Sequence, residues 1–133
     1  MSDFDQSQWA DPAFARGYLD HADHYLPDRQ YLFHVLRSFF RFYIARPEPV
    51  RLCELGCGDG ILTDQLLREA PTLEATLVDG SVEMIDAAKR RFAGRPDVRY
   101  VQQGFDGVIR DSSALGSFHF IVSSFAIHHL HRD

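Results

Sequence analysis

Cysteine is scarce in this sequence, and its spacing excludes two classes of small protein. Only Cys53 and Cys57 occur among the 133 residues. Four positions apart, they fit neither a disulfide scaffold nor a four-ligand zinc site. We therefore expect two small side chains in a tight place, in a protein of the reducing cytoplasm.

The sequence also lacks an excess of positive charge and a long apolar run. A formal charge of −5 and a pI near 5.7 argue against a protein that binds the phosphate backbone of nucleic acids. No apolar stretch is long enough to span a membrane, and residues 1–5 are too acidic for a signal peptide. Hydrophobic residues make up 45% of the chain, which is enough for one packed domain.

Two segments before residue 50 have helical periodicity. Residues 12–24 follow a capping Asp11 and are expected to be helical, and we expect residues 9–25 to form a partial lid. Residues 28–45 are expected to pack against a sheet, with Arg29 exposed on the opposite face. The apolar stripe of this second helix is expected to comprise Tyr31, Leu32, Val35, Leu36, Phe39, Phe40, Tyr43 and Ile44.

From residue 50 onward, predicted strands alternate with predicted helices. The strands are expected at 50–55, 75–78, 98–101 and 118–122, and the helices at 61–70 and 81–92, with 104–117 loop-like or weakly helical. Such alternation predicts an α/β fold in which a parallel sheet carries helices on both faces. We expect residues 1–49 to be a helical lead-in and 50–133 to form the domain.

A glycine-rich loop follows the first strand. The stretch Glu54–Gly60 reads E-L-G-C-G-D-G, and such a turn needs glycine for positive φ and for close approach of backbone to a ligand. Asp79 ends the next strand, 19 residues beyond Gly60, where a carboxylate can accept hydrogen bonds from both hydroxyls of a ribose. The third glycine of a dinucleotide fingerprint would fall on Ile61, which disfavours a nicotinamide cofactor.

Three stretches together resemble the class I S-adenosylmethionine-dependent methyltransferases. They are Glu54–Gly60, Leu77–Ile85 and Phe118–Leu130, which match the family's first, second and fourth motifs in order and spacing. The resemblance implies a Rossmann-like parallel sheet with the strand order 3-2-1-4. It also implies that S-adenosylmethionine is the cofactor and that residues 50–133 are a partial S-adenosylmethionine-binding domain.

The resemblance also implies roles for individual residues. Glu54 would lie near the methionine amine, Asp79 would bind the ribose hydroxyls and Met84 would line the adenine pocket. The cofactor-binding set implied in this way is Glu54, Gly56, Cys57, Gly58, Asp79, Gly80, Met84, Gly104, Phe105 and Ser123. Of these, Gly56, Gly58 and Ser123 would lie at the methionine end.

One position departs from the family pattern. Gly104 stands where the family usually has an acid that accepts a hydrogen bond from the adenine amino group. Asp106, Gln103 or the backbone of Phe105 could replace it. A second departure is His119 in place of an aspartate before the fourth strand, which we interpret as structural.

Histidines gather near the end of the sequence. His128, His129 and His131 lie just beyond the fourth strand. His128 and His129 are candidate substrate-facing residues or general bases, and for at least one of them we expect helix capping or packing instead. No metal site is expected, because no acid or cysteine stands at a convincing ligand spacing from them.

The expected function is transfer of a methyl group from S-adenosylmethionine to a small-molecule acceptor. The alternatives are a non-catalytic cofactor-binding or partner-dependent module and an NAD-dependent oxidoreductase. From Val50 through Asp133 there are 84 residues with four expected strands, whereas seven strand-helix units need about 200. We therefore expect a truncated form whose fourth strand has an open edge, available for self-association or a partner.

Overall fold

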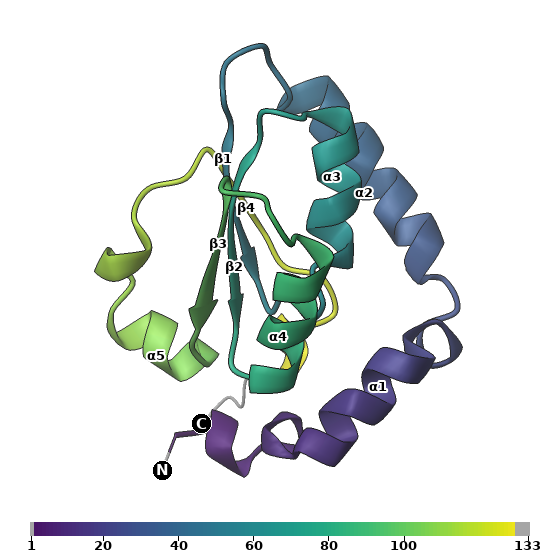
Figure 1. Cartoon of the computed structure of the whole chain (residues 1–133), viewed down its shortest axis with the longest axis vertical. Helices are drawn as coiled ribbons and strands as arrows, with labels where there is room; N and C mark the ends of the chain where they lie inside the picture. The colour runs from purple at the N-terminus through teal and green to yellow at the C-terminus, as the bar shows by residue number, and fades with distance from the viewer. Residues whose placement is uncertain (1, 130–133) are drawn as a thin grey trace.

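A single four-stranded parallel sheet organises the chain in the computed structural model, which describes residues 2–129 (Figure 1). The strands are β1 (Arg51–Leu55), β2 (Glu74–Asp79), β3 (Val98–Gln102) and β4 (Phe120–Val122). Their order is β3-β2-β1-β4, which confirms the expected order 3-2-1-4. Leu130, the last residue of the third matching stretch, and His131 lie outside the described residues.

Helices cover both faces of the sheet, as expected. Figure 1 shows α2, α3 and α4 on one face and α5 on the other, while α1 runs past the end where the strands terminate. The α-helices are α1 (Pro12–Tyr25), α2 (Arg29–Tyr43), α3 (Ile61–Glu69), α4 (Val82–Arg91) and α5 (Phe105–Arg110). The 3-10 helices are η1 (Phe4–Gln6), η2 (Gln8–Ala10), η3 (Ser113–Leu115) and η4 (Ile127–His129). Within residues 2–129, no helix has the length and apolar character of a membrane span.

The helix starts follow from local capping. The Asp11 carboxylate accepts a hydrogen bond from the Ala13 N–H at 2.8 Å, as expected for the N-cap of α1. The Ser81 hydroxyl accepts one from the Met84 N–H at 3.4 Å and so caps α4. These hydrogen bonds fix the first residues of α1 and α4, directly after Asp11 and Ser81.

Alternation along the strands divides the core between the two faces of the sheet. Leu52 and Leu77 are fully buried against α3 and α4, whereas Cys53 and Val78 belong to a smaller cluster on the α5 side. Cys53 and Cys57 are both free and buried, so the expectation of two small side chains in a tight place is confirmed.

The predicted apolar stripe of α2 is confirmed at Leu36, Phe40 and Ile44, which lie in or against the core, and is wrong for its exposed half. The buried residues of α2 are Arg29, Phe33 and Phe40, whereas Tyr31 and Tyr43 are 72% and 75% exposed. The predicted stripe is two residues wide at each turn, and one residue of each pair is exposed, namely Tyr31, Val35, Phe39 and Tyr43. Phe42 is a further large apolar side chain exposed on α2.

The burial of Arg29 also differs from the prediction that this side chain is exposed. Arg29 is 8% exposed, although the helical pattern placed it on the outer face. Its guanidinium pairs with Asp23 at 2.7 Å and lies 5.6 Å from the centre of the Phe33 ring. Asp23, near the end of α1 and six residues before Arg29, thus pairs with it across the turn between the two helices, a contact that the periodicity of α2 does not reveal.

Candidate functional site

A cavity opens where the four strands end, between the sheet and the N-terminal segment. Its empty space, including the mouth, is about 1210 Å³. It is lined by residues from η1, η2, α1 and α2 on one side and from the loops after β1, β2, β3 and β4 on the other. In an open parallel sheet, ligands bind in the crevice outside the carboxyl ends of the strands, which is the place of this cavity.

The glycine-rich loop runs along the floor of this cavity with three left-handed residues. Gly56, Gly58 and Gly60 have φ values of +69°, +55° and +78°. A Cβ on Gly60 would lie 2.5 Å from the Phe92 ring, so this glycine lets α3 pack against α4. A Cβ on Gly58 would meet only the Met84 sulfur, at 3.9 Å. Gly58 therefore exposes its backbone to the cavity.

Asp79 is fixed beside this backbone at the end of β2. Its Oδ2 accepts a hydrogen bond from the Gly58 N–H and its Oδ1 accepts one from the Ser81 N–H, both at 2.9 Å. Burial raises the pKa of Asp79, and the backbone N–H groups of Ser81, Gly58 and Gly80 oppose this shift. Each oxygen keeps a free lone pair, so the carboxylate can accept from a ligand as well.

Glu54 lies beneath the loop and is 2% exposed. The Thr63 hydroxyl donates a hydrogen bond of 2.6 Å to its Oε2. Burial, the largest cause, raises the pKa of Glu54 to about 8, and the Thr63 bond only partly opposes this. In the absence of a cation the side chain is therefore largely protonated at neutral pH.

The cavity brings together nine of the ten residues that the resemblance implied. These are Glu54, Gly56, Cys57, Gly58, Asp79, Gly80, Met84, Gly104 and Phe105. Gln103 and Asp106, the alternatives for the missing acid, also line it. Burial holds the pKa of Cys57 well above its usual value, so this side chain is a thiol and no ready nucleophile.

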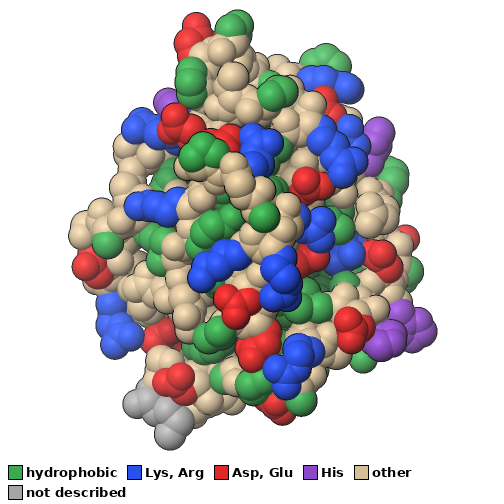
Figure 2. All heavy atoms as spheres, in the orientation of Figure 1, with side chains coloured by type: hydrophobic (Ala, Val, Ile, Leu, Met, Phe, Trp, Pro, Cys, Tyr) green, Lys and Arg blue, Asp and Glu red, His purple; other side chains and the backbone are tan. Residues whose placement is uncertain are grey.

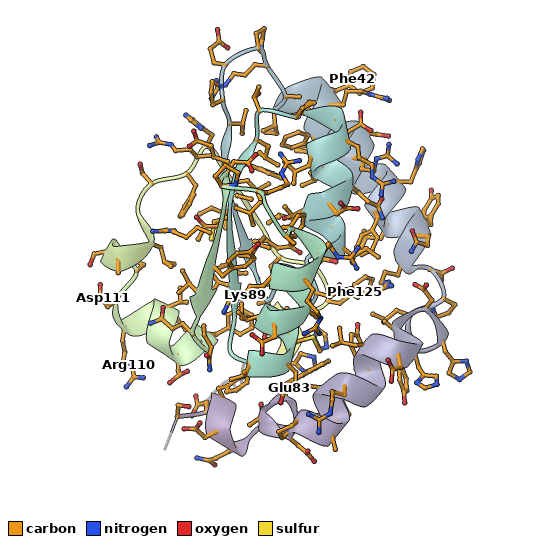
Figure 3. All side chains as sticks on the ribbon, in the orientation of Figure 1. Phe42, Glu83, Lys89, Arg110, Asp111 and Phe125 are labelled. Carbon is orange, nitrogen blue, oxygen red and sulfur yellow. The ribbon has the colours of Figure 1, made fainter. Side chains whose placement is uncertain are left out.

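Ser123 is the exception, because it is absent from the cavity lining. Its hydroxyl donates a hydrogen bond of 2.7 Å to the Leu55 carbonyl and so ties the end of β4 to the end of β1. The next residues, Ser124, Phe125 and Ala126, line the cavity instead. Phe125 has a φ of +55° and is the one non-glycine residue with positive φ among those described. Figure 3 shows it between the sheet and α1.

The N-terminal segment supplies the opposite wall. Trp9, Tyr18, Ala22 and Arg29 all line the cavity. The Trp9 ring packs edge-on against Tyr18 at 4.9 Å and against His129 at 5.3 Å between ring centres. Trp9, in the segment expected to form a partial lid, is thus in contact with η4, the last element described.

Phe4 also belongs to this wall, and the sequence analysis missed it. A Cβ on Gly104 would lie 2.8 Å from the Phe4 Cβ, and one on Gly80 would overlap its ring. The absence of side chains at these two glycines therefore makes room for η1 at the ends of β2 and β3. Two glycines after consecutive strands were the available signal.

The two candidate histidines differ in their position relative to the cavity. His129 lines the cavity, whereas His128 is exposed and its ring lies beside that of His129, tilted by 42° with 3.9 Å between ring centres. Burial and the neighbouring His128 lower the pKa of His129. His119 donates its backbone N–H to Arg51 and accepts from the Arg51 N–H through Nδ1 at 3.0 Å. This contact confirms a structural role for His119.

Two buried donors in the cavity wall have no hydrogen-bond partner among residues 2–129. They are the Trp9 Nε1 and the Ser124 Oγ. Over the same residues, no group of three His, Cys, Asp or Glu side chains is arranged to hold a metal ion. Acidic and basic side chains are interspersed over the face in Figure 2, which has no continuous basic patch.

Comparison with known proteins connects this arrangement to one family. A model described as a methyltransferase domain matches residues 53–133. The malonyl-[acyl-carrier protein] O-methyltransferase of Halalkalibacterium halodurans is 28% identical over 80 residues, which are 60% of this chain and 30% of that protein. The trans-aconitate 2-methyltransferase of Pseudomonas aeruginosa is 50% identical over 42 residues, which are 32% of this chain and 15% of that protein.

Solved structures share the fold at lower identity. The plantazolicin methyltransferase BpumL in complex with SAH has a TM-score of 0.62 at 20% identity, over 86% of this chain and 43% of that one. An O-methyltransferase family protein from Burkholderia thailandensis has a TM-score of 0.57 at 22% identity, over 85% and 32%. The chain spans less than a third of the length of the curated relatives that it matches.

Proposed function

Because the chain belongs to the methyltransferase domain family, we propose that its cavity binds S-adenosylmethionine for methyl transfer to a small-molecule acceptor. The observation that carries this proposal is the pair formed by Gly58 and Asp79. A left-handed glycine opens its backbone to the cavity and donates its N–H, at 2.9 Å, to a carboxylate that still has free lone pairs. This combination suits the ribose of the cofactor and the methionine group attached to it.

The nucleoside half of the cofactor is proposed to lie along the ends of β2 and β3. Asp79 would accept hydrogen bonds from the two ribose hydroxyls. The adenine ring would lie near Met84 and Phe105, which both line the cavity. Asp106, Gln103 and the backbone of Phe105 are the candidates for its amino group.

The methionine half is proposed to lie over Gly56 and Gly58. Arg29 is the one Arg or Lys side chain that lines the cavity within the described residues, and it suits the methionine carboxylate. Glu54 suits the ammonium group, because a nearby cation favours the ionised carboxylate and offsets the burial that raises its pKa.

Methyl transfer from S-adenosylmethionine requires few catalytic groups from the protein. When bound, the cofactor supplies a methyl group already activated by its sulfonium. The residues of this chain would hold both partners in line and exclude water, which is where the N-terminal wall of Trp9 and Tyr18 contributes. No covalent step through Cys57 is proposed, because that side chain is a buried thiol.

Further parts of the proposal concern the setting of the domain. We retain 1–49 as the cover and 50–133 as the S-adenosylmethionine-binding part, in a cytoplasmic protein. A partner or second copy is proposed to pack along the open edge of the sheet at β4, where Ile121 is 59% exposed on the α5 side. The outer face of α2, on the other side of the sheet, has a second exposed apolar side chain, Phe42, at 76%. Figure 3 shows Phe42 pointing away from the sheet.

Calorimetric titration with S-adenosylhomocysteine tests the proposed function. We expect saturable binding to the wild-type chain and no binding of NAD under the same conditions. Asp79→Asn should weaken binding by about tenfold or more, because a hydrogen bond to a charged group is replaced by a neutral one. Binding of NAD in preference to S-adenosylhomocysteine would support the oxidoreductase alternative instead.

A further inference from the structure

The first residues of the described chain lie against the ends of β2 and β3, and we call residues 2–8 the strap (Figure 1). Three of its side chains, Asp3, Phe4 and Ser7, line the cavity. The side-chain hydrogen bonds of the strap are local, and they join Ser2 to Asp5 and Ser7 to the Phe4 carbonyl. Within residues 2–129, no hydrogen bond or ion pair connects the strap to the sheet or to the loops that follow its strands. Apolar packing is therefore what attaches it there.

Phe4 is the one apolar side chain of the strap. Its ring lies on Gly80, where a Cβ would overlap it, and its own Cβ lies 2.8 Å from the place that a Cβ on Gly104 would take. Gly80 follows β2 and Gly104 follows β3, so one side chain bridges two strand ends. Phe4 is partly exposed rather than buried, and it lines the same cavity as both glycines. It therefore belongs to the cavity surface at these two strand ends.

The polar groups beside Phe4 complete a site for a planar base. Asp79 directly precedes Gly80, and the proposed function places the ribose hydroxyls on its carboxylate. The Oδ1 of Asp106 lies 2.8 Å from the place of a Cβ on Gly104, so it approaches the same point as the Phe4 Cβ. The Oδ2 of Asp106 accepts a hydrogen bond from Arg110 at 2.9 Å, whereas Oδ1 has no hydrogen bond within residues 2–129. An aromatic ring beside a free carboxylate oxygen suits a base that carries an amino group.

We propose that Phe4 is a cofactor-binding residue that covers the adenine ring, and that the strap closes over the bound nucleoside, an inference that rests on the proposed function. A base that extends from a ribose on Asp79 along the ends of β2 and β3 comes into contact with Phe4, which bridges these ends. Because a single apolar side chain attaches the strap, the strap can leave the strand ends while the cofactor enters. The closed strap and the bound base then stabilise each other.

Calorimetry with two ligands tests the contact with the base. S-adenosylhomocysteine contains adenosine and an amino-acid group, whereas 5′-methylthioadenosine has the nucleoside and the thioether without the amino-acid group. Phe4→Ala should weaken the binding of both ligands by about tenfold, because the stacking of a base on an aromatic ring is lost. Ile109→Ala removes an exposed apolar side chain of α5 that does not line the cavity, and this control should change neither affinity.

Phe4→Leu separates contact with the base from attachment of the strap. Leucine retains an apolar side chain that can pack on Gly80 and Gly104, but it has no aromatic ring to stack on a base. This variant should have the Tm of the wild type and bind both ligands at least about fivefold more weakly. It also provides the comparison with the wild type if Phe4→Ala does not fold.

Hydrogen exchange of the strap amides, followed by mass spectrometry, tests the closure. Saturation with 5′-methylthioadenosine should slow exchange in residues 2–8 of the wild type, because the bound base holds the closed strap. The same saturation should leave exchange in these residues of Phe4→Ala unchanged. Equal exchange in the wild type with and without the ligand would overturn the closure.

The affinities of Phe4→Ala decide the rest of the inference. Wild-type affinity for both ligands would overturn it, and so would tighter binding, which would mean that the Phe4 ring occupies the place of the base. Weaker binding of S-adenosylhomocysteine alone would also overturn it, because Phe4 would then act only at the methionine end, through Arg29. Failure of the wild-type chain to bind either ligand would instead refute the proposed function on which the inference depends.

Discussion

Replacing Gly56 by alanine should destabilise the fold by more than its backbone conformation alone would cost. Gly56 has a φ of +69°, where an alanine costs about 1–2 kcal/mol. The new Cβ would also overlap the Ala126 Cβ and lie 3.2 Å from the Phe105 ring. Overpacking of this kind costs about 1–3 kcal/mol, so we expect a total loss of about 2–5 kcal/mol.

Gly94 provides the matched control for this substitution. Its φ is +81°, but a Cβ there would have no heavy atom within 4 Å. Gly94→Ala should therefore cost only the conformational part, about 1–2 kcal/mol. The difference between the two variants isolates the packing of the loop after β4 against the glycine-rich loop.

Thermal unfolding followed by circular dichroism measures this difference. At about 3–5 °C per kcal/mol for a chain of this size, Gly56→Ala should lower Tm by at least about 3 °C more than Gly94→Ala. Gly56→Ala should also weaken S-adenosylhomocysteine binding, because Ala126 must move. Equal Tm values for the two variants would refute the close contact between Gly56 and Ala126.

Four other predictions follow from the same geometry. Gly58→Ala should lower the free energy of unfolding only by the backbone strain, about 1–2 kcal/mol. It should nevertheless bind S-adenosylhomocysteine at least about tenfold more weakly in calorimetry, because the new Cβ enters the cavity. Asp79→Asn should lose affinity in the same titration, whereas Glu74→Gln, at the exposed start of β2, should not. Because folding raises the pKa of Glu54 from 4.5 to about 8, the folded state holds an extra proton between these values. Urea unfolding should thus show wild-type stability falling relative to Glu54→Gln as pH rises from 5 to 8, and a parallel dependence would contradict this. Ile121→Glu should reduce self-association in sedimentation velocity, and a wild-type monomer would contradict the proposed contact.

The positions of the strands and the floor of the cavity could be predicted from local sequence, whereas the order of the strands was implied by the family resemblance. Strand periodicity placed β1 to β3 within one or two residues, and the spacing from Gly60 to Asp79 placed both at the same end of the sheet. These features depend on residues that are close in sequence, or on the rule that parallel strands end at one edge. Local sequence patterns are therefore sufficient to predict this part of the site.

The walls of the cavity depend on long-range contacts and could not be predicted in the same way. Phe4 reaches the sheet because Gly80 and Gly104 leave space, and Arg29 is buried where it pairs with Asp23 across the turn between α1 and α2. Neither contact leaves a periodic signal. The apolar stripe of α2 indicated a helix correctly, but not which half of the stripe would be covered.

The position of Ser123 outside the cavity lining has a local cause. Strand alternation ends at Val122, and the chain then turns through Phe125 with its φ of +55°. In that turn Ser123 bonds to Leu55, and Ser124 faces the cavity. A displacement by one residue past a strand end changes which side chain reaches a ligand, and sequence alone does not determine the turn.

The central claim is that this cavity is an S-adenosylmethionine site, and one titration tests it most directly. S-adenosylhomocysteine is added to the purified 133-residue chain in a calorimeter, with NAD in a parallel experiment. The account predicts saturable one-to-one binding of S-adenosylhomocysteine, weakened in Asp79→Asn, and no heat of binding with NAD. No binding of S-adenosylhomocysteine by a folded chain would contradict it.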